Sequence, residues 1–395
     1  MTEGEFHPQP SRSQENSLTE RFSPLHDIHV AGGASFTDFA GWQMPVSYGS
    51  DLAEHHAVRT AAGIFDISHM AEIQVKGPDA AAFLDYALAG KISAVKPMQA
   101  KYSLLLNEQG GIIDDLVVYA NGENEYLVVA NAGNRFAVVP ALLERSTAFD
   151  VEVNDLSDDI SLIAVQGPNS RAILEATARL EILDDLTPLD QLKYYWSTGA
   201  TFNRSTVYIG RTGYTGEDGF ELYVDVAHAA DLWNALVAAG ADHGLVPAGL
   251  ASRDTLRLEA GMPLYGHELG VDTFPVQAGL GRVVALTKEG DFVGRSAVEA
   301  GPAENARVLV GLTTEGRRAG RADYEVFIGE PDGVEPPSVP VGIVTSGALS
   351  PTLGFPIAMA YVEPDALDKP LTIDVRGTRI PASIVSLPFY KREAK

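Results

Sequence analysis

Cysteine is absent from this chain of 395 residues. That absence excludes disulfide bonds, metal sites built from thiolates and a cysteine nucleophile. Basic residues are also few: 29 Lys and Arg stand against 53 Asp and Glu, for a formal net charge of −24. A protein that binds nucleic acid needs a basic surface, and the small cluster Arg317, Arg318 and Arg321 is interpreted as a solvated loop. We therefore expect no nucleic acid partner.

Long apolar runs are missing as well. A membrane helix needs ~20 consecutive apolar residues, and no stretch approaches that length. Residues 1–17 are polar and include Glu3, Glu5 and Glu15, so they resemble neither a signal peptide nor a transit peptide. We expect a disordered tail over residues 1–20, no membrane contact and a cytoplasmic location.

Several catalytic motifs are lacking. The chain contains no H-E-x-x-H zinc motif, no G-x-S-x-G nucleophile elbow and no Walker loop. His55 and His56 are adjacent and cannot both project from one face of a helix, and His69 stands alone. Structural or solvent-exposed roles therefore explain these histidines better than ligation, and we expect no metal.

Short β-branched runs separated by Gly and Pro, with helical segments between them, predict an α+β protein. Residues 73–84 resemble residues 163–174: each reads as a strand, a Gly turn and a helix with Pro in its first turn. This similarity indicates duplicated βα units, although Gly-Pro before a helix is also common by chance. At this length two or three domains are expected.

The pattern changes around residues 288–306, where glycines replace periodic apolar residues. Short predicted strands follow at 307–312, 341–346 and 371–375 with little helical signal. These features are typical of a small β-barrel or sandwich.

Two adjacent aspartates begin a strand-like run over residues 110–119. Because neighbours on a strand point to opposite faces, Asp115, Val117 and Tyr119 share one face and Asp114 shares the other. A carboxylate and a tyrosine on one face could line a cavity for a basic, ring-shaped ligand. Alternatively, both aspartates sit at a frayed strand start and bond to backbone amides.

Residues 211–223 read as a turn between two strands, and their glycine spacing does not match the dinucleotide fingerprint. Pattern alone favours Glu221 as a solvated charge on an edge strand. Over residues 249–261, Ser252 or Asp254 could cap a short helix. Arg257 can pair with Asp254, whereas a cation at Arg253 near the helix start favours an external anionic partner.

Seven segments occur in the same order as in a known family. Together they resemble the glycine cleavage T-protein family over residues 25–390: 39–46, 65–70, 110–119, 129–133, 211–221, 251–261 and 344–347. The resemblance implies an α+β, three-domain, cloverleaf-like fold that binds folate in a central channel. Two interleaved α+β domains would occupy residues 21–290, and a C-terminal β-barrel domain residues 305–395.

The resemblance also implies an activity. Members of the family take the aminomethyl group carried on the lipoyl arm of H protein, release ammonia and form 5,10-methylenetetrahydrofolate. The implied partners are lipoylated H protein and, functionally, the P and L proteins, with tetrahydrofolate as the one-carbon acceptor.

Site residues follow from the matching segments. Asp115 matches the family's catalytic carboxylate. Met70, Tyr102, Val117 and Tyr119 match residues that pack around folate. Tyr214, Glu221 and Arg253 match residues that hold its pterin end, and Arg392 loosely matches a C-terminal folate contact. A carboxylate such as Glu221 can accept two parallel hydrogen bonds from a pterin.

Three related groups share the implied fold. The dimethylglycine and sarcosine dehydrogenases add a flavin domain, but this chain has no N-terminal G-x-G-x-x-G and is far shorter. Folate-binding proteins of iron–sulfur assembly carry a Lys-Gly-Cys motif that this chain lacks. Sulfoniopropionate demethylases, which also use tetrahydrofolate, are the nearest enzymatic alternative.

Overall fold

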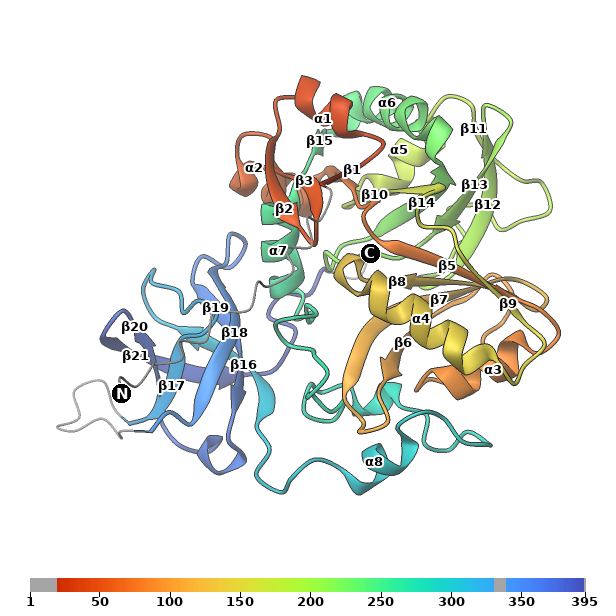
Figure 1. Cartoon of the computed structure of the whole chain (residues 1–395). Helices are drawn as coiled ribbons and strands as arrows, with labels where there is room; N and C mark the ends of the chain where they lie inside the picture. Colours follow the sequence, from red (N-terminus) through yellow and green to blue (C-terminus); the bar gives the residue numbers. More distant parts are fainter. Residues whose placement is uncertain (1–19, 330–338, 394–395) are drawn as a thin grey trace, which may run out of the picture.

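The computed structural model describes residues 20–329 and 339–393. Apart from Glu20, the predicted disordered tail over residues 1–20 lies outside the described residues. The described chain forms three sheet-based units, with a closed barrel on one side and two mixed helix-and-sheet units on the other (Figure 1). Within these residues, no helix combines the length and the apolar composition needed to cross a membrane.

The first unit contains a seven-stranded sheet with the order β11-β12-β13-β14-β10-β4-β15. Its strands are β4 (Ala62–Asp66), β10 (Ile160–Gln166), β11 (Leu180–Ile182), β12 (Ser197–Phe202), β13 (Ser205–Gly210), β14 (Gly219–Asp225) and β15 (Leu245–Pro247). Helices α5 (Ser170–Ala176) and α6 (Ala229–Gly240) pack on one face. The apolar core between them includes Ile173, Leu232 and Trp233.

An N-terminal segment adds a small three-stranded sheet to this unit (Figure 1). Its elements are β1 (Arg21–Phe22), α1 (His26–Ala31), β2 (Ser35–Phe39), β3 (Trp42–Ser47) and α2 (Asp51–Thr60). The side chain of Ser50 accepts a hydrogen bond from the backbone of Ala53 and so caps α2.

The second unit contains a five-stranded antiparallel sheet with the order β6-β7-β8-β5-β9. Its strands are β5 (Ala71–Lys76), β6 (Ala100–Leu106), β7 (Ile112–Gly122), β8 (Glu125–Ala130) and β9 (Glu152–Asp155). Helices α3 (Ala80–Ala87) and α4 (Arg135–Ser146) cover one face, where Leu116 and Val118 of β7 are buried. The opposite face packs toward the first unit: Tyr119 of β7, Leu162 of β10 and Tyr223 of β14 share one apolar cluster.

The duplicated βα units predicted from the sequence are confirmed. The chain turns from β5 into α3 at Gly77 and from β10 into α5 at Gly167, with φ angles of 140° and 129°. A Cβ at Gly77 would lie 2.4 Å from the carbonyl oxygen of Asp150, so a side chain there would clash with backbone. The helices begin two residues after the prolines, at Ala80 and Ser170, so proline precedes the first turn and does not lie within it.

The C-terminal unit is a closed barrel with the order β16-β19-β18-β17-β20-β21, which selects the barrel over the sandwich. Its strands are β16 (Val308–Thr314), β17 (Glu325–Ile328), β18 (Gly342–Leu349), β19 (Pro356–Val362), β20 (Leu371–Val375) and β21 (Thr378–Val385). The predicted strands at 307–312, 341–346 and 371–375 correspond to β16, β18 and β20. Helix α8 (Arg295–Ala300) lies in the connection before the barrel.

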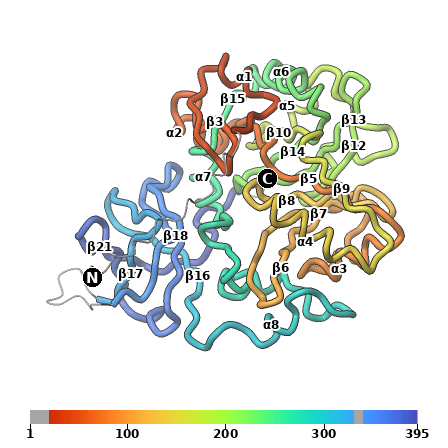
Figure 2. Tube along the Cα trace, viewed as in Figure 1, coloured from red at the N-terminus to blue at the C-terminus, as the bar shows by residue number. Residues whose placement is uncertain are grey.

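Helix α7 (Leu250–Glu259) lies between the barrel and the other two units, and the chain after the barrel returns to the same region (Figure 2). There the backbone amide of Tyr390 donates to the carbonyl of Glu259 at 2.8 Å. Short 3₁₀ turns complete the described helices: Ala132–Asn134, Val226–His228, Ala241–His243, Gly281–Val283 and Pro364–Ala366.

Candidate active site

A cavity of about 320 Å³ lies where the two sheets and α7 meet. Most of the residues predicted from the sequence line it: Met70, Tyr102, Asp115, Val117, Tyr214, Glu221 and Arg253. Aromatic and aliphatic side chains dominate the remaining wall, which suits a flat organic ligand. The cavity therefore gathers segments from positions 67 to 280 of the chain.

Asp115 projects from β7 into one part of this cavity. Its Oδ2 accepts a hydrogen bond from the hydroxyl of Tyr102 at 2.9 Å, and its Oδ1 accepts one from Nδ2 of Asn131 at 2.8 Å. Burial raises the pKa of Asp115, and the two hydrogen bonds oppose that shift only in part. The carboxylate is thus held in one orientation and has an increased affinity for a proton.

Asp114 projects from the other face of β7, as alternation predicts. It is fully buried and accepts hydrogen bonds from the backbone amide and Nδ2 of Asn131, at 2.9 and 2.8 Å, and from Nδ2 of Asn134. Burial and the adjacent charge of Asp115 raise the pKa of Asp114 to about 7. The alternative of backbone amides at the strand start is correct in that one donor is a backbone amide, but it is wrong about place, because all these donors follow β8.

Glu221 lines the cavity from β14. This strand pairs with β10 on one side and β13 on the other, so the interpretation of Glu221 as a solvated edge charge is wrong. Its Oε2 accepts a hydrogen bond from the hydroxyl of Thr212 at 2.5 Å. Burial raises the pKa of Glu221, while Thr212 and the charge of Arg253 lower it.

Tyr119 lies beneath the cavity wall and is fully buried. Its hydroxyl lies 2.6 Å from Oγ1 of Thr212 and donates to Oε2 of Glu221 at 3.4 Å. It shares a face with Asp115, as predicted, but it supports Glu221 from below and does not form part of the lining.

Arg253 enters the cavity from α7, with its guanidinium carbon 4.9 Å from the ring centre of Tyr214. None of the ion pairs among residues 20–329 and 339–393 includes it, and in the same residues its buried Nη1 finds no acceptor. Burial lowers the pKa of Arg253. A buried cation without a partner is costly, which favours a ligand that presents a carbonyl or an anionic oxygen here.

Arg257, one turn further along α7, is paired as the sequence predicts. It bonds to Asp254 and, at 3.0 Å, to Glu268. The predicted helix cap by Ser252 or Asp254 was wrong: Gly249 occupies the N-cap position, so both residues lie inside the helix.

Arg392 is not brought into the cavity lining. Its Nη1 lies 3.6 Å from Oδ1 of Asp218, which also bonds to Arg211. The C-terminal segment nevertheless approaches the cavity, because Leu387 and Pro388 pack close to Gly261, one of the lining residues.

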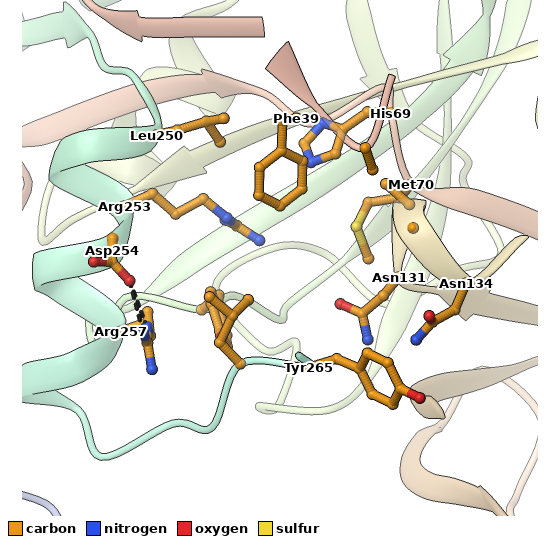
Figure 3. Close-up of a pocket in the computed structure, with 15 residues that line it drawn as sticks. Phe39, His69, Met70, Asn131, Asn134, Leu250, Arg253, Asp254, Arg257 and Tyr265 are labelled. Atoms are coloured by element: carbon orange, nitrogen blue, oxygen red, sulfur yellow. Dashed lines mark hydrogen bonds and ion pairs between the residues drawn. The ribbon is translucent and has the colours of Figure 1, made fainter. Parts of the chain in front are cut away.

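A second cavity of about 220 Å³ adjoins the first and is lined mainly by apolar side chains, among them Phe39, Leu250, Leu264 and Tyr265. Figure 3 shows Arg253 reaching from α7 into it. His69 also lines it, and burial together with the charge of Arg253 lowers the pKa of this histidine to about 4. Four residues line both cavities: Met70, Asn131, Tyr214 and Arg253.

No role was predicted for Asn131 or Thr212 from the sequence, although both belong to segments that resemble the family. Asn131 contacts both aspartates, and Thr212 contacts Glu221. Each contact joins residues at least nine positions apart, so only the matched segments could have drawn attention to them. In the part of the chain that the structure describes, no group of three His, Asp or Glu side chains could hold a metal ion.

The chain is similar to known proteins over most of its length. Residues 25–288 match the family described as GCVT N-terminal domain, and residues 307–391 match the glycine cleavage T-protein C-terminal barrel domain. An aminomethyltransferase of Cutibacterium acnes is 55% identical over 95% of this chain and 99% of its own. One of Streptomyces coelicolor is 53% identical over 95% and 100%.

A solved structure is similar as well. The crystal structure of glycine cleavage system aminomethyltransferase T from Bartonella henselae superposes with a TM-score of 0.83 at 36% identity, covering 94% of this chain and 98% of that one. This chain belongs to the glycine cleavage T-protein family and is an aminomethyltransferase.

Proposed function

We propose that the larger cavity binds tetrahydrofolate, with the pterin held between Glu221 and Arg253 and the reacting nitrogens beside Asp115. The observation that carries this proposal is the arrangement of these three charged side chains around one aromatic-lined cavity. Glu221 suits the amino and ring N–H groups of a pterin, and Arg253, whose Nη1 has no acceptor among the residues that the structure describes, suits its carbonyl oxygen.

The donor in this proposal is the aminomethyl group on the lipoyl arm of H protein, which would reach folate through the second cavity. The methylene carbon leaves its sulfur and its amine nitrogen and becomes bonded to N5 and N10 of tetrahydrofolate. The products are 5,10-methylenetetrahydrofolate, ammonia and the reduced lipoyl thiol. One N–H proton of folate passes to the ammonia and the other to the thiol.

Asp115 would act in this reaction by position and charge. Tyr102 and Asn131 hold its carboxylate, and its raised pKa suits a group that accepts a proton from a folate nitrogen. Its negative charge also favours cationic character at the transferred carbon. Holding nitrogen and carbon in contact accounts for much of the rate increase in a two-substrate reaction of this kind.

Two interleaved α+β domains occupy residues 21–290 and the barrel domain residues 305–395, with Arg392 as a further folate contact near the C-terminus. The P and L proteins are functional partners, and the setting is the cytoplasm.

The decisive experiment measures ammonia and 5,10-methylenetetrahydrofolate formed from aminomethylated H protein with and without this chain. We expect both products at equal amounts, and only when tetrahydrofolate is present. A dimethylsulfoniopropionate demethylation assay run in parallel should give no product. Methyl transfer in that assay without ammonia release in the first would replace the proposed donor.

A further inference from the structure

Glu259 is a buried carboxylate on α7, the helix that also carries Arg253, and it joins this helix to the barrel. Glu259 is fully buried in the last turn of α7. Its Oε1 accepts hydrogen bonds from the hydroxyl of Ser350 and, at 3.0 Å, from the backbone amide of Thr352. Its Oε2 accepts one from the hydroxyl of Thr352 at 2.7 Å. Both donors lie in the loop between β18 and β19, so one side chain anchors α7 to the barrel.

Arg59 of α2 is the second partner of this carboxylate. Its Nη2 and Nε donate to Oε2 of Glu259 at 2.7 and 3.1 Å. Its Nη1 donates in another direction, to the carbonyl of Thr215 at 2.6 Å and to Oε1 of Glu217 at 3.0 Å. Arg59 therefore ties the end of α7 to the turn that leads into β14.

The two segments that Arg59 joins carry different parts of the larger cavity wall. Thr212 precedes the turn and Glu221 follows it, so both belong to the first segment. Arg253 belongs to the second segment, α7. The side chains of Arg59 and Glu259 are only 4% and 0% exposed, so water does not weaken their attraction as it does at a surface.

The pKa of Glu259 lies well below its ordinary value. Burial by itself raises the pKa of Glu259, but the hydrogen bond from His55 and the charge of Arg59 lower it to about 2. The ring of Tyr390 covers the guanidinium of Arg59 at 4.2 Å, so the chain after the barrel also closes over this pair.

We propose that Arg59 and Glu259 form a positioning pair, which sets the separation of Glu221 and Arg253 and so makes pterin binding depend on the docked barrel loop. The inference rests on the proposed function for the identity of the ligand. The pair contacts side chains and backbone that support the cavity wall, and neither residue lines the cavity. Lysine at position 59 would keep the charge but lose the planar fork that reaches both segments.

Steady-state kinetics with tetrahydrofolate and aminomethylated H protein varied in turn test this role. We expect Arg59→Lys to raise the KM for tetrahydrofolate ~10-fold, while kcat and the KM for H protein change less than ~2-fold. Glu363→Gln is the matched control, because it breaks the ion pair with Arg307 at the barrel, 3.2 Å long, without touching α7. It should leave all three constants unchanged.

Thr352→Val supplies a second, milder test. Valine keeps the shape of the side chain but removes the hydroxyl that the barrel loop offers to Glu259, and we expect a ~3-fold rise in the same KM. This variant decides the matter if Arg59→Lys proves unfolded in a thermal melt. An unchanged KM for tetrahydrofolate in either folded variant, or equal rises in both KM values, overturns the inference. Failure of the unmodified protein to use tetrahydrofolate would instead overturn the proposed function.

Discussion

Asp114 and Asp115 point to opposite faces of β7, yet the side-chain amide of one residue, Asn131, donates a hydrogen bond to each of them at 2.8 Å. Asp115 faces the cavity between the two sheets, and Asp114 faces the helix-covered side of its sheet. Two carboxylates that are adjacent in the sequence thus have different surroundings, and their substitution should have different effects.

We expect Asp115→Asn to lower turnover ~10²- to 10⁴-fold, the usual contribution of a positioned acid–base group, with little change in folate affinity. Asp114→Asn should instead lower the free energy of unfolding by ~1–3 kcal/mol, because an amide cannot accept all the hydrogen bonds that the carboxylate accepts. The measurements are kcat and denaturant unfolding of both variants. Equal rate losses, or the larger loss at Asp114, would contradict the assignment.

Glu221 and Arg253 should govern the affinity for folate. Glu221→Gln removes a charge-assisted bond and should weaken binding of tetrahydrofolate by ~1.5–3 kcal/mol, and Arg253→Ala should weaken it by a similar amount. Calorimetry with a folate analogue measures both. Glu181→Gln, on the exposed face of strand β11 in the same sheet, is the control and should bind normally. Unchanged affinity in both test variants would remove these residues from the ligand site.

Folate should also stabilise the folded protein, because a ligand that binds only the native state adds to its stability. At 100 times its dissociation constant the gain is ~2.7 kcal/mol. Thermal melts with tetrahydrofolate, NAD, FAD and pyridoxal phosphate compare the candidates under one set of conditions. A rise in Tm with one of the other three, and none with tetrahydrofolate, would exclude the proposed ligand.

His69 should make the fold sensitive to acid. Its pKa is about 4 in the folded protein, lowered by burial and by Arg253, against ~6.5 in an unfolded chain. Between those values the unfolded state binds a proton that the folded state does not, so stability is lost as the pH falls from 6.5 to 4. Over that interval the unmodified protein should lose roughly 3 kcal/mol more than His69→Gln does.

The measurement is urea unfolding at several pH values. His56→Gln, at an exposed position on α2, is the control and should keep the slope of the unmodified protein. The same slope in His69→Gln would mean that the folded protein does not lower the pKa of this histidine.

Local patterns predicted the parts of the site that depend on one strand or one turn. Alternation placed Asp115 and Tyr119 on one face because a strand has a period of two wherever it lies in a sheet. The interpretation of Glu221 as an edge charge was wrong. Whether its strand is central or at an edge depends on the neighbours β10 and β13 and not on the strand's own residues. The predicted helix cap was wrong because Gly249, which precedes both candidates, is the N-cap of α7, and the helix begins at Leu250.

Local patterns could not predict contacts between residues that are distant in the sequence. Arg59 and Glu259 are 200 positions apart, and Asn131 and Asp114 are 17 apart. Nothing in either member of such a pair specifies the other, because the packing of whole units brings them together. Resemblance to a family supplied the list of cavity residues, which the spacing of side chains alone left open.

Under the proposed function, the wall shared by the two cavities would link the binding of tetrahydrofolate to that of the lipoyl arm. Met70, Asn131, Tyr214 and Arg253 each border both spaces, so a molecule that shifts one of these side chains in the first space reshapes the second. The volume left for the molecule that binds second therefore depends on the molecule that binds first. We expect the enzyme to show a preferred order of substrate addition, because these four side chains line both pockets.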